Sequence, residues 1–480
     1  MRAEFAHLGV DGSGITIGVI SDGVTNSHLS VASGDLPSNF GFNTNLPHFG
    51  DEGTAMLEIV HDLAPGANLL FSSGRFGQTT MIDSINWLVA NGADVIVDDL
   101  GFLEEPYFDD GPIADAVQNA IDGGVVYVTS AGNFGDASHW QGQYELVGGA
   151  LHDFLPGPGA DATLDFEVPP NTTFRINAQW SDEFSSSSND YDLFLLLGNT
   201  VVAESRAVQN GNDDPYEALS WANGSNTPNP VVSLVVLKFP SAADRELEIF
   251  ARGGINVDGR ATDADTIFGH AALEDVISVG AVNALDPGLD DVRDYSSRGP
   301  STIYTDFANQ VSTQRSTLDV IGVDGVQTNI GQIGLFSNPF NGTSAAAPHM
   351  AAIGALLLDA RNGMTPAEVS QAFTNAATDI EAPGYDNVAG HGFVNAHDAI
   401  MEMRLWQNPV NPLDTNNSGS VSPADRLVII NALNANGGQP IALPDPAIPL
   451  PGNFLDANGD NVISAADEAL VFDCLANQVC

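Results

Sequence analysis

Residues 341–358 read NGTSAAAPHMAAIGALLL, a long apolar run that opens with a short polar segment. Ala and Leu favour helix, and a run of this length with few polar residues predicts a helix packed inside a large domain. Gly342 permits a tight turn just before it, so Ser344 falls in the first helical turn. The sequence therefore predicts a serine at the N-terminus of a long apolar helix.

A serine in this position has two interpretations. The unpaired N–H groups of a helix N-terminus can stabilise a developing oxyanion, which suits a nucleophile. Serine is also a common helix-capping residue, and the motif taken alone favours that simpler interpretation. Ser344 by itself therefore does not establish an enzyme.

Short apolar strands alternate with helix-like segments in the first part of the chain. The run ITIGVI begins at Ile15, and helix-like segments cover residues 80–91 and 113–122. This alternation predicts an α/β fold in which helices cover both faces of a parallel sheet. Further strand-like runs begin at Ala67, Ala93 and Val125.

The pattern changes at about residue 146, where apolar and polar residues begin to alternate. Phe174 and Ile176 belong to one such stretch, and later strand-like runs begin at Tyr191 and Val231, separated by Gly, Asn, Ser and Pro turns. Period-two alternation is typical of half-buried antiparallel strands. Residues 146–261 are therefore predicted to form an inserted all-β sandwich, which resembles the pre-peptidase C-terminal type of domain.

Several motifs occur together in the order found in one family of peptidases. Gly-Thr-Ser344-Ala-Ala-Ala-Pro is close to the nucleophile motif of subtilisin-like serine peptidases, Ile-Ser-Asp22-Gly resembles their aspartate strand, and Ser-Ala-Gly-Asn133 resembles their oxyanion-hole segment. The resemblance covers about residues 10–140 and 265–400. It implies a subtilisin-like parallel-sheet domain, a serine endopeptidase activity, and an Asn133 amide that donates a hydrogen bond to the oxyanion.

One position departs from that family. Where subtilisin-like enzymes have His-Gly-Thr at the start of a helix, this chain has Glu52-Gly-Thr. The glutamate resembles the sedolisins, acid-acting relatives in which glutamate replaces the histidine. In those enzymes an aspartate one helical turn later supports the glutamate, whereas this chain has Met56 there. The resemblance implies that Glu52 is the general base and that a supporting aspartate comes from elsewhere.

Two places offer that aspartate. Asp22 follows the first strand, one residue later than in the subtilisin pattern, and Asp98 and Asp99 end the strand that by resemblance lines the substrate channel. Crowded carboxyl groups share protons, which raises the pKa of one of them. For Asp98 and Asp99 the alternative is a solvated or calcium-binding turn. His48 and His61 are alternative bases, although neither stands in the Gly-Thr context.

The C-terminal part contains two loops rich in Asp, Asn and Ser, each followed by an apolar helix-like segment. Oxygen ligands recur at positions 1, 3, 5, 9 and 12, with a backbone carbonyl at 7, which is the pattern of an EF-hand loop and predicts bound Ca²⁺. The repeat resembles a type I dockerin and implies a cohesin-type partner, whereas two unrelated acidic turns are the alternative. The ligands are Asp414, Asn416, Ser418, Ser420, Ser422 and Asp425 in the first loop, and Asp456, Asn458, Asp460, Val462, Ser464 and Asp467 in the second.

The composition excludes several classes of function. The chain has 62 acidic and 14 basic residues, so its surface repels phosphate backbones and no nucleic-acid partner is expected. It contains no run of 18 or more apolar residues, so no membrane span is expected. The two cysteines, Cys474 and Cys480, lie at the C-terminus, which excludes a cysteine nucleophile in the body of the chain.

These patterns predict a modular protein with two competing functions. The first is an extracellular or cell-surface serine endopeptidase that cleaves protein or peptide substrates. The alternative is a binding or scaffold protein on an inactive peptidase fold, for which the missing histidine is the evidence. The expected division is a peptidase domain at 1–145 and 262–403, an inserted β-sandwich at 146–261, a linker at 404–413 and a dockerin-like module at 414–480.

Overall fold

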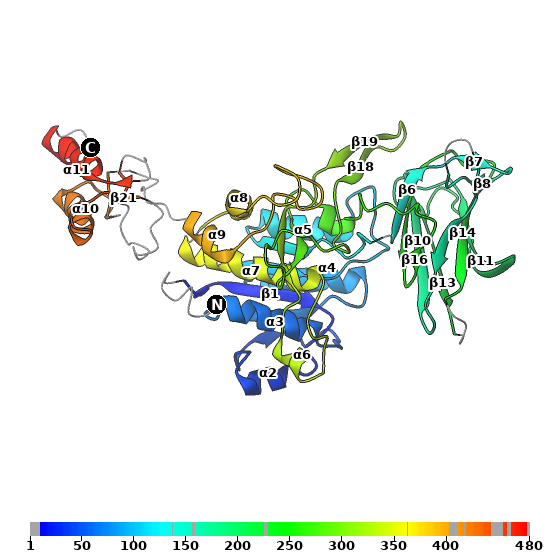
Figure 1. The fold of residues 1–480 in the computed structure, drawn as a ribbon, viewed down its shortest axis with the longest axis horizontal. Coiled ribbons are helices and arrows are strands. Elements are labelled where there is room, and N and C mark those ends of the chain that lie inside the picture. Colours follow the sequence, from blue (N-terminus) through cyan, green and yellow to red (C-terminus); the bar gives the residue numbers. More distant parts are fainter. Residues whose placement is uncertain are drawn as a thin grey trace.

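A computed structural model describes residues 10–136, 138–155, 159–224, 229–361, 363–402, 411, 413–416, 418–442, 455–457 and 462–477. Within these residues, a parallel sheet flanked by helices forms the body of the protein, and antiparallel strands form a second, all-β unit beside it (Figure 1). The predicted α/β class is confirmed.

Seven parallel strands form the central sheet. Because helices cover both of its faces, each inner strand is apolar along its length instead of alternating, and the buried run at Ile17–Ile20 is an example. Asp98 pairs with Thr129 across two central strands, so polar residues begin at the same edge. The strand order is β2 (Gly41–Phe42), β3 (Asn68–Ser73), β1 (Thr16–Ser21), β4 (Val95–Asp98), β5 (Val126–Ser130), β17 (Ile277–Asn283) and β20 (Val320–Asp324).

Two layers of helix enclose the sheet. Helices α3 (Glu52–Leu63) and α7 (Thr343–Ala360) share one apolar core, and α4 (Gln78–Ala90) and α5 (Pro112–Asp122) share the core on the opposite face. Gly342, with φ of 104°, makes the turn into α7 in a conformation that favours glycine. The remaining helical elements of the body are α2 (Ser27–Ser33), α6 (Asn329–Gln332), α8 (Pro366–Ala376), α9 (Ala396–Glu402) and the 3₁₀ turn η1 (Gly269–Ala272).

The all-β unit lies between β5 and β17 in the sequence and consists of two antiparallel sheets around one apolar core. One sheet has the order β13 (Tyr216–Ala222), β10 (Thr173–Trp180), β15 (Glu246–Arg252) and β6 (His139–Gln143). The other contains β12 (Thr200–Ser205), β11 (Tyr191–Leu197), β14 (Val231–Lys238), β8 (Leu151–His152) and β7 (Leu146–Val147), with β9 (Leu164–Glu167) paired to β14 and to β16 (Ile255–Asn256).

Strand β6 lies before residue 146, where the sequence predicted the sandwich to begin. Its sequence, HWQGQ, lacks the apolar alternation that marked the other strands. It nevertheless pairs with β15 along five residues, because a backbone ladder does not require an alternating side-chain pattern. The sheet therefore extends a few residues further toward β5 than expected.

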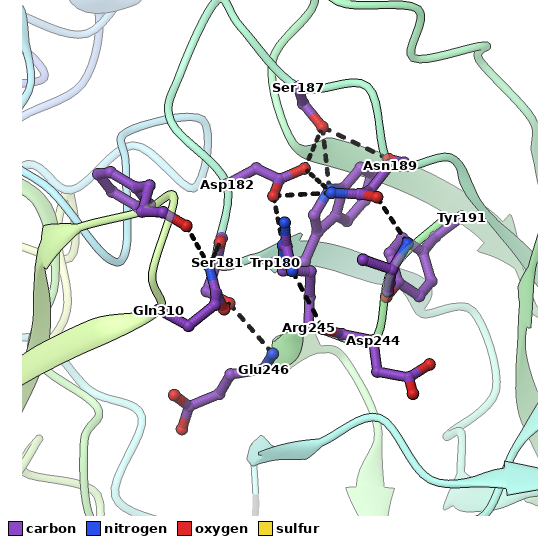
Figure 2. A network of polar contacts seen from close by, with 12 residues as sticks. Trp180, Ser181, Asp182, Ser187, Asn189, Tyr191, Asp244, Arg245, Glu246 and Gln310 are labelled. Carbon is purple, nitrogen blue, oxygen red and sulfur yellow. Dashed lines mark hydrogen bonds and ion pairs between the residues drawn. The ribbon is translucent and has the colours of Figure 1, made fainter. Parts of the chain in front are cut away.

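Aromatic packing and hydrogen bonds join the sandwich to the body. Phe250 of β15 packs in one cluster with Phe134 and Phe268, which flank the sandwich in the sequence. At the start of β15, Ser181, the residue after β10, donates from Oγ to Gln310 Oε1 at 2.7 Å, next to the hairpin formed by β18 (Ser301–Asp306) and β19 (Val311–Arg315) (Figure 2). The sandwich is thus held at several points.

The same close-up shows a buried polar network at the start of β15. Asp182 accepts hydrogen bonds from Arg245 Nε at 2.6 Å, from Ser187 Oγ at 2.8 Å and from Asn189 Nδ2 at 2.8 and 2.9 Å (Figure 2). A buried carboxylate with this many partners fixes the side chains around it. The network therefore orders the β15 end that lies near the hairpin.

The C-terminal part contains two helices, α10 (Pro423–Ala435) and α11 (Ala465–Asn477), and a short antiparallel pair, β21 (Ile441–Ala442) and β22 (Val462–Ile463). An apolar cluster that includes Ile429 and Val471 joins the helices, and Arg426 forms an ion pair with Glu468. Across all the described residues, no helix is long and apolar enough to cross a membrane.

Candidate active site

The carboxyl ends of β1, β4 and β5 and the N-terminus of α7 meet at one edge of the central sheet. Parallel strands that neighbour one another present their carboxyl ends at the same edge. Asp22 follows β1, Asp99 follows β4, and Asn133 follows β5, so residues far apart in the sequence come together there. Ser344 joins them from the first turn of α7.

Ser344 is 9% exposed and lines a small pocket together with Asn133 and Asp99. Because it lies in the first turn, its backbone N–H has no acceptor earlier in the helix. The turn before it is fixed by Gly342, whose N–H donates to Asp324 Oδ2 at 2.8 Å. The serine hydroxyl is therefore held at a helix N-terminus, accessible from the pocket.

The carboxyl group of Glu52 contacts the side chains of Ser344 and Asp99. Burial raises the pKa of Glu52 above its ordinary value of 4.5, and the nearby Asp22 charge raises it further. The contacts with Asp99 and Ser344 and the charge of Arg75 lower it in part. A carboxyl with a raised pKa beside a serine hydroxyl has the properties of a general base.

Asp99 is the second carboxyl beside Glu52. Both of its side-chain oxygens are buried. The side chains of Ser21 and Glu52 lie close enough to it to act on its pKa. Burial raises the pKa of Asp99 well above 3.8, and the Glu52 charge adds to this. The protonated form of Asp99 is therefore favoured next to an ionised Glu52.

Asp22 contacts the backbone of Glu52 and not its carboxyl. Asp22 Oδ1 accepts hydrogen bonds from the N–H groups of Glu52 at 3.0 Å and Gly53 at 3.4 Å. Gly50 permits this approach, because a Cβ there would lie 1.8 Å from Asp22 Oδ2. Of the two places predicted to support Glu52, only Asp99 contacts its carboxyl.

Asn133 is oriented by the residue before the serine. The backbone N–H of Thr343 donates to Asn133 Oδ1 at 3.1 Å, and the Thr343 hydroxyl does so at 3.3 Å. With its oxygen engaged in this way, the Asn133 Nδ2 group is left to donate into the pocket that Ser344 also lines. This geometry suits an oxyanion-stabilising amide.

Asp98 points to the opposite side of β4, where a buried cluster was not predicted. The solvated-turn interpretation is wrong for Asp98, which is fully buried and contacts His270 Nε2 at 3.2 Å. His270 Nδ1 contacts Glu105 Oε2 at 2.9 Å. Burial alone would lower the pKa of His270, but the Glu105 and Asp98 charges together raise it well above 6.5. Glu105 and His270 are distant in sequence and form no local motif, so sequence reasoning had no signal for them.

A second unpredicted group, centred on Asp324, supports the turn before Ser344. Asp324 ends β20 and is fully buried. It accepts a hydrogen bond from Arg293 Nε at 2.7 Å and another from the Tyr295 hydroxyl. Its position at the carboxyl end of an apolar strand was the available sequence signal.

The two histidines named as alternative bases lie elsewhere. His48 Nδ1 accepts a 3.5 Å hydrogen bond from Val24 N–H, and its ring lies edge-on to Phe71. His61 is in the last turn of α3, nine residues after Glu52, which corresponds to about 14 Å along the helix axis. Glu52 is therefore the helix α3 residue placed beside the serine.

The first predicted calcium loop gathers its oxygen groups closely. Asp414 and Asp425 are 3% and 0% exposed, so both carboxylates are buried. Backbone N–H groups fold around them, such as Ser418 N to Asp414 Oδ1 at 2.9 Å and Ser422 N to Asp425 Oδ2 at 2.7 Å. Buried carboxylates that converge in this way fit a bound divalent cation.

The second loop is described in part. Asp456 and Asp467 are 2% and 0% exposed, and Ser464 N donates to Asp467 Oδ2 at 2.8 Å, as in the first loop. The predicted ligands Asn458 and Asp460 lie outside the described residues. In both loops, the aspartate at position 12 accepts the backbone N–H of the serine at position 9, at the start of the helix that follows.

Comparison with known proteins identifies two family models that match the chain. The model of the subtilase family matches residues 49–149 and 197–392, which include Glu52, Asn133 and Ser344. The model of the dockerin type I domain matches residues 412–475. Asp22 lies outside both segments that the subtilase model matches.

Among individual proteins, the chain is 29% identical over 256 residues to subtilisin DY of Bacillus licheniformis, covering 48% of this chain and 80% of that protein. It is 40% identical over 66 residues to an extracellular serine protease of Serratia marcescens, covering 14% of this chain and 6% of that protein. The structure of the Clostridium perfringens CspB protease superposes with a TM-score of 0.55 at 14% identity, covering 84% of this chain and 97% of that chain.

Proposed function

The chain belongs to the subtilase family of serine peptidases, and we propose that it is an endopeptidase in which Ser344 is the nucleophile and Glu52 the general base. The observation that carries the proposal is the contact between the Glu52 carboxyl, with its raised pKa, and the Ser344 side chain. Proton transfer to and from a serine needs such a group, and a carboxylate serves this role where histidine is absent.

The reaction would proceed in two halves. Ser344 Oγ attacks the peptide carbonyl carbon while its proton passes to Glu52, and the Ser344 N–H and Asn133 Nδ2 stabilise the resulting oxyanion. The C–N bond then breaks as Glu52 returns the proton to the leaving amine. Water, deprotonated by Glu52, attacks the acyl-enzyme, and its proton returns through Glu52 to Ser344 as the acid is released.

Asp99 would support Glu52 as its proton-sharing neighbour. A protonated Asp99 adds no second negative charge beside Glu52. Asp22 would act differently, as a positioning residue that fixes the start of helix α3. In sedolisins the supporting aspartate lies on the same helix as the glutamate. Here Asp99, which follows a strand of the central sheet, would take its place. Met56 occupies the helical position and is buried in the core.

We propose that the dockerin type I domain binds Ca²⁺ and docks on a cohesin-type partner outside the cell. The oxygen groups of Asp414, Asn416, Ser418, Ser420, Ser422 and Asp425, and of the corresponding positions from Asp456 to Asp467, would hold the ions. Calcium would supply the charge that lets the buried carboxylates approach one another. The inserted sandwich would accompany the peptidase as a domain of the pre-peptidase C-terminal type.

The test is hydrolysis of unfolded casein and chromogenic peptides between about pH 3 and 8. Glu52→Gln removes the proton acceptor at nearly constant shape and should lower kcat by roughly 10⁴-fold. Ser344→Ala should do the same and should abolish labelling by a fluorophosphonate. Activity of the parent should extend into acid, and its acidic limit should follow the raised pKa of Glu52.

Glu58→Gln is a matched control, since it makes the same change on the same helix at a carboxyl that accepts the N–H of Asn329 at the start of α6. It should keep the turnover of the parent even if it lowers the melting temperature. A parent that neither cleaves nor labels at any pH, or a Glu52→Gln variant as fast as the parent, would establish the scaffold alternative.

A further inference from the structure

A small pocket opens at the nucleophile. It has a volume of about 60 Å³, and its lining includes Ser344, Asn133 and the segments that follow β4 and β5. Glu52 is not part of the lining. Because Glu52 returns the proton to the leaving amine in the proposed reaction, the pocket lies on the other side of the scissile bond, where the acyl part of the substrate binds.

One wall of this pocket comes from the inserted sandwich. Arg252, the last residue of β15, lines the pocket, and its guanidinium carbon lies 4.7 Å from the centroid of the Phe134 ring. Phe134 and Phe268 form the adjoining apolar surface. A long side chain that enters here would meet two aromatic rings and then a cation.

Arg252 is unusual among the cations of this protein. Nine of the ten other arginines that the structure describes form ion pairs with carboxylates, as expected for a chain with 62 acidic residues. Arg252 has no hydrogen bond or ion pair to any described residue and is exposed at the pocket mouth. A guanidinium left without a carboxylate in so acidic a protein is available to one from outside.

The other charged groups at the pocket do not compete for that role. His270 forms part of the floor, but its charge is already met by Asp98 on one nitrogen and Glu105 on the other. Asp99 also lines the pocket, and burial favours its neutral form. A ligand carboxylate at Arg252 would therefore meet one unpaired cation and no ionised acid of the lining.

The strand that carries Arg252 is firmly placed. Arg252 pairs with Arg175 across the β10–β15 ladder, and Phe250, two residues earlier, is fully buried against Phe134 and Phe268. The opposite end of β15 is ordered by the Asp182 network (Figure 2). A side chain on such a strand gives more precise recognition than one on a loop.

We propose that this pocket binds an acidic side chain of the substrate, above all glutamate, on the acyl side of the scissile bond, and that Arg252 is the residue that recognises its carboxylate. The two methylene groups of glutamate would pack on Phe134 and Phe268, and its carboxylate would reach the guanidinium. The assignment rests on the proposed peptidase function and adds the substrate class to it.

The experiment uses peptide p-nitroanilides that are identical except for the residue before the scissile bond, which is Glu, Gln, Asp, Lys or Phe. With the parent chain, kcat/KM for Glu should exceed that for Gln by roughly 10- to 100-fold, the usual effect of a charge-assisted hydrogen bond. Arg252→Gln should remove this preference, Arg252→Lys should keep part of it, and Arg252→Glu should favour Lys instead.

Arg175→Gln is the matched control. Arg175 is the cross-strand neighbour of Arg252, but Arg175 does not line the pocket. The substitution should leave the ratio of Glu to Gln unchanged. Equal rates for Glu and Gln in an active parent, or an unchanged ratio in Arg252→Gln, would overturn the assignment while leaving the peptidase function intact.

Measuring peptide affinity tests recognition of the acidic side chain separately from cleavage of the peptide bond. Fluorescent peptide amides that end in Glu or Gln are titrated into Ser344→Ala with and without Arg252→Gln, and their anisotropy gives the Kd values. Tighter binding of the Glu peptide that depends on Arg252 supports the assignment even if no substrate is cleaved. Equal Kd values for the two peptides overturn it.

Discussion

The backbone N–H of Glu52 donates to Asp22 Oδ1 at 3.0 Å, so Asp22 holds the first turn of the helix that carries the proposed general base. A negative charge at a helix N-terminus is favourable. The same charge raises the pKa of Glu52, since it makes ionisation of a second nearby carboxyl harder. Asp22 thus affects both the position and the pKa of Glu52 without touching its side chain.

Replacing Asp22 by Asn should shift the acidic limit of activity. Asn retains an oxygen that can accept the Glu52 N–H but removes the charge, so the pKa of Glu52 should fall and activity should persist to lower pH. Turnover near neutral pH should stay within about tenfold of the parent, as expected for a positioning residue. The pH profile of kcat/KM measures both effects. A loss as large as that of Glu52→Gln would instead make Asp22 part of the proton transfer.

Replacing Asp99 by Asn tests whether its protonated form is the one that supports Glu52. Asn is also neutral and can donate to Glu52, so Asp99→Asn should keep activity within about tenfold of the parent near neutral pH. Asp99→Ala removes the donor and leaves a cavity, so it should lose considerably more. The measurement is the steady-state kcat and KM of Asp99→Asn and Asp99→Ala, each compared with the parent. An Asp99→Asn variant as inactive as Asp99→Ala would mean that a titrating carboxyl is required.

His270 should make the stability of the protein depend on pH. Its pKa is raised in the folded state, so its ion pairs contribute fully below the unfolded value of 6.5 and are lost as pH rises through the folded value. His270→Asn leaves two carboxylates buried without their cation and should cost about 3 kcal/mol at pH 6. The cost should shrink at higher pH.

Thermal unfolding between about pH 5 and 9 measures this effect. His397→Asn is the control, because His397 contacts Asp398 at 3.0 Å on the exposed surface and should change the melting temperature little. A His270→Asn variant whose destabilisation is the same at every pH would show that packing, and not charge, accounts for the role of His270.

Calcium should control the folding of the C-terminal domain separately from the peptidase. Chelation should remove one unfolding transition of the full chain, because the buried carboxylates of Asp414 and Asp425 then repel one another. Asp425→Asn should lower calcium affinity by roughly tenfold or more. Asp473→Asn, on the exposed side of helix α11, should not. Calorimetry with and without a chelator would contradict the proposal if both traces were the same.

The sequence predicted those parts of the molecule that depend on local patterns. The strand at residues 15–20 and the helix after Gly342 were recognisable because burial on all sides leaves an unbroken apolar run. The β6 strand was not, since HWQGQ carries no periodic signal and forms through its partner β15. Long-range pairing of this kind is not encoded in any short window.

The residues of the site also fall into two groups: those that stand in sequence motifs and those that long-range packing brings together. Ser344 and Asn133 stand in motifs that resemble those of the subtilisin-like peptidases, so the resemblance implied both. Asp22 and the pair Asp98 and Asp99 were all candidates, because the carboxyl that reaches the Glu52 side chain is determined by the spacing of strands and not by the order of residues. Arg252 had no signal at all, as it reaches the pocket only because the sandwich packs against Phe134 and Phe268.

The insertion of the sandwich between β5 and β17 also sets an order on synthesis. Glu52 and Asp99 leave the ribosome early, but β5 must wait for the whole sandwich before its partner β17 emerges, and helix α7 with Ser344 follows later still. Because domains made first fold first, the sandwich can complete its own core while the central sheet is unfinished. Ser344 and Glu52, the proposed nucleophile and base, therefore come together only near the end of translation of the peptidase part, after the sandwich has been made.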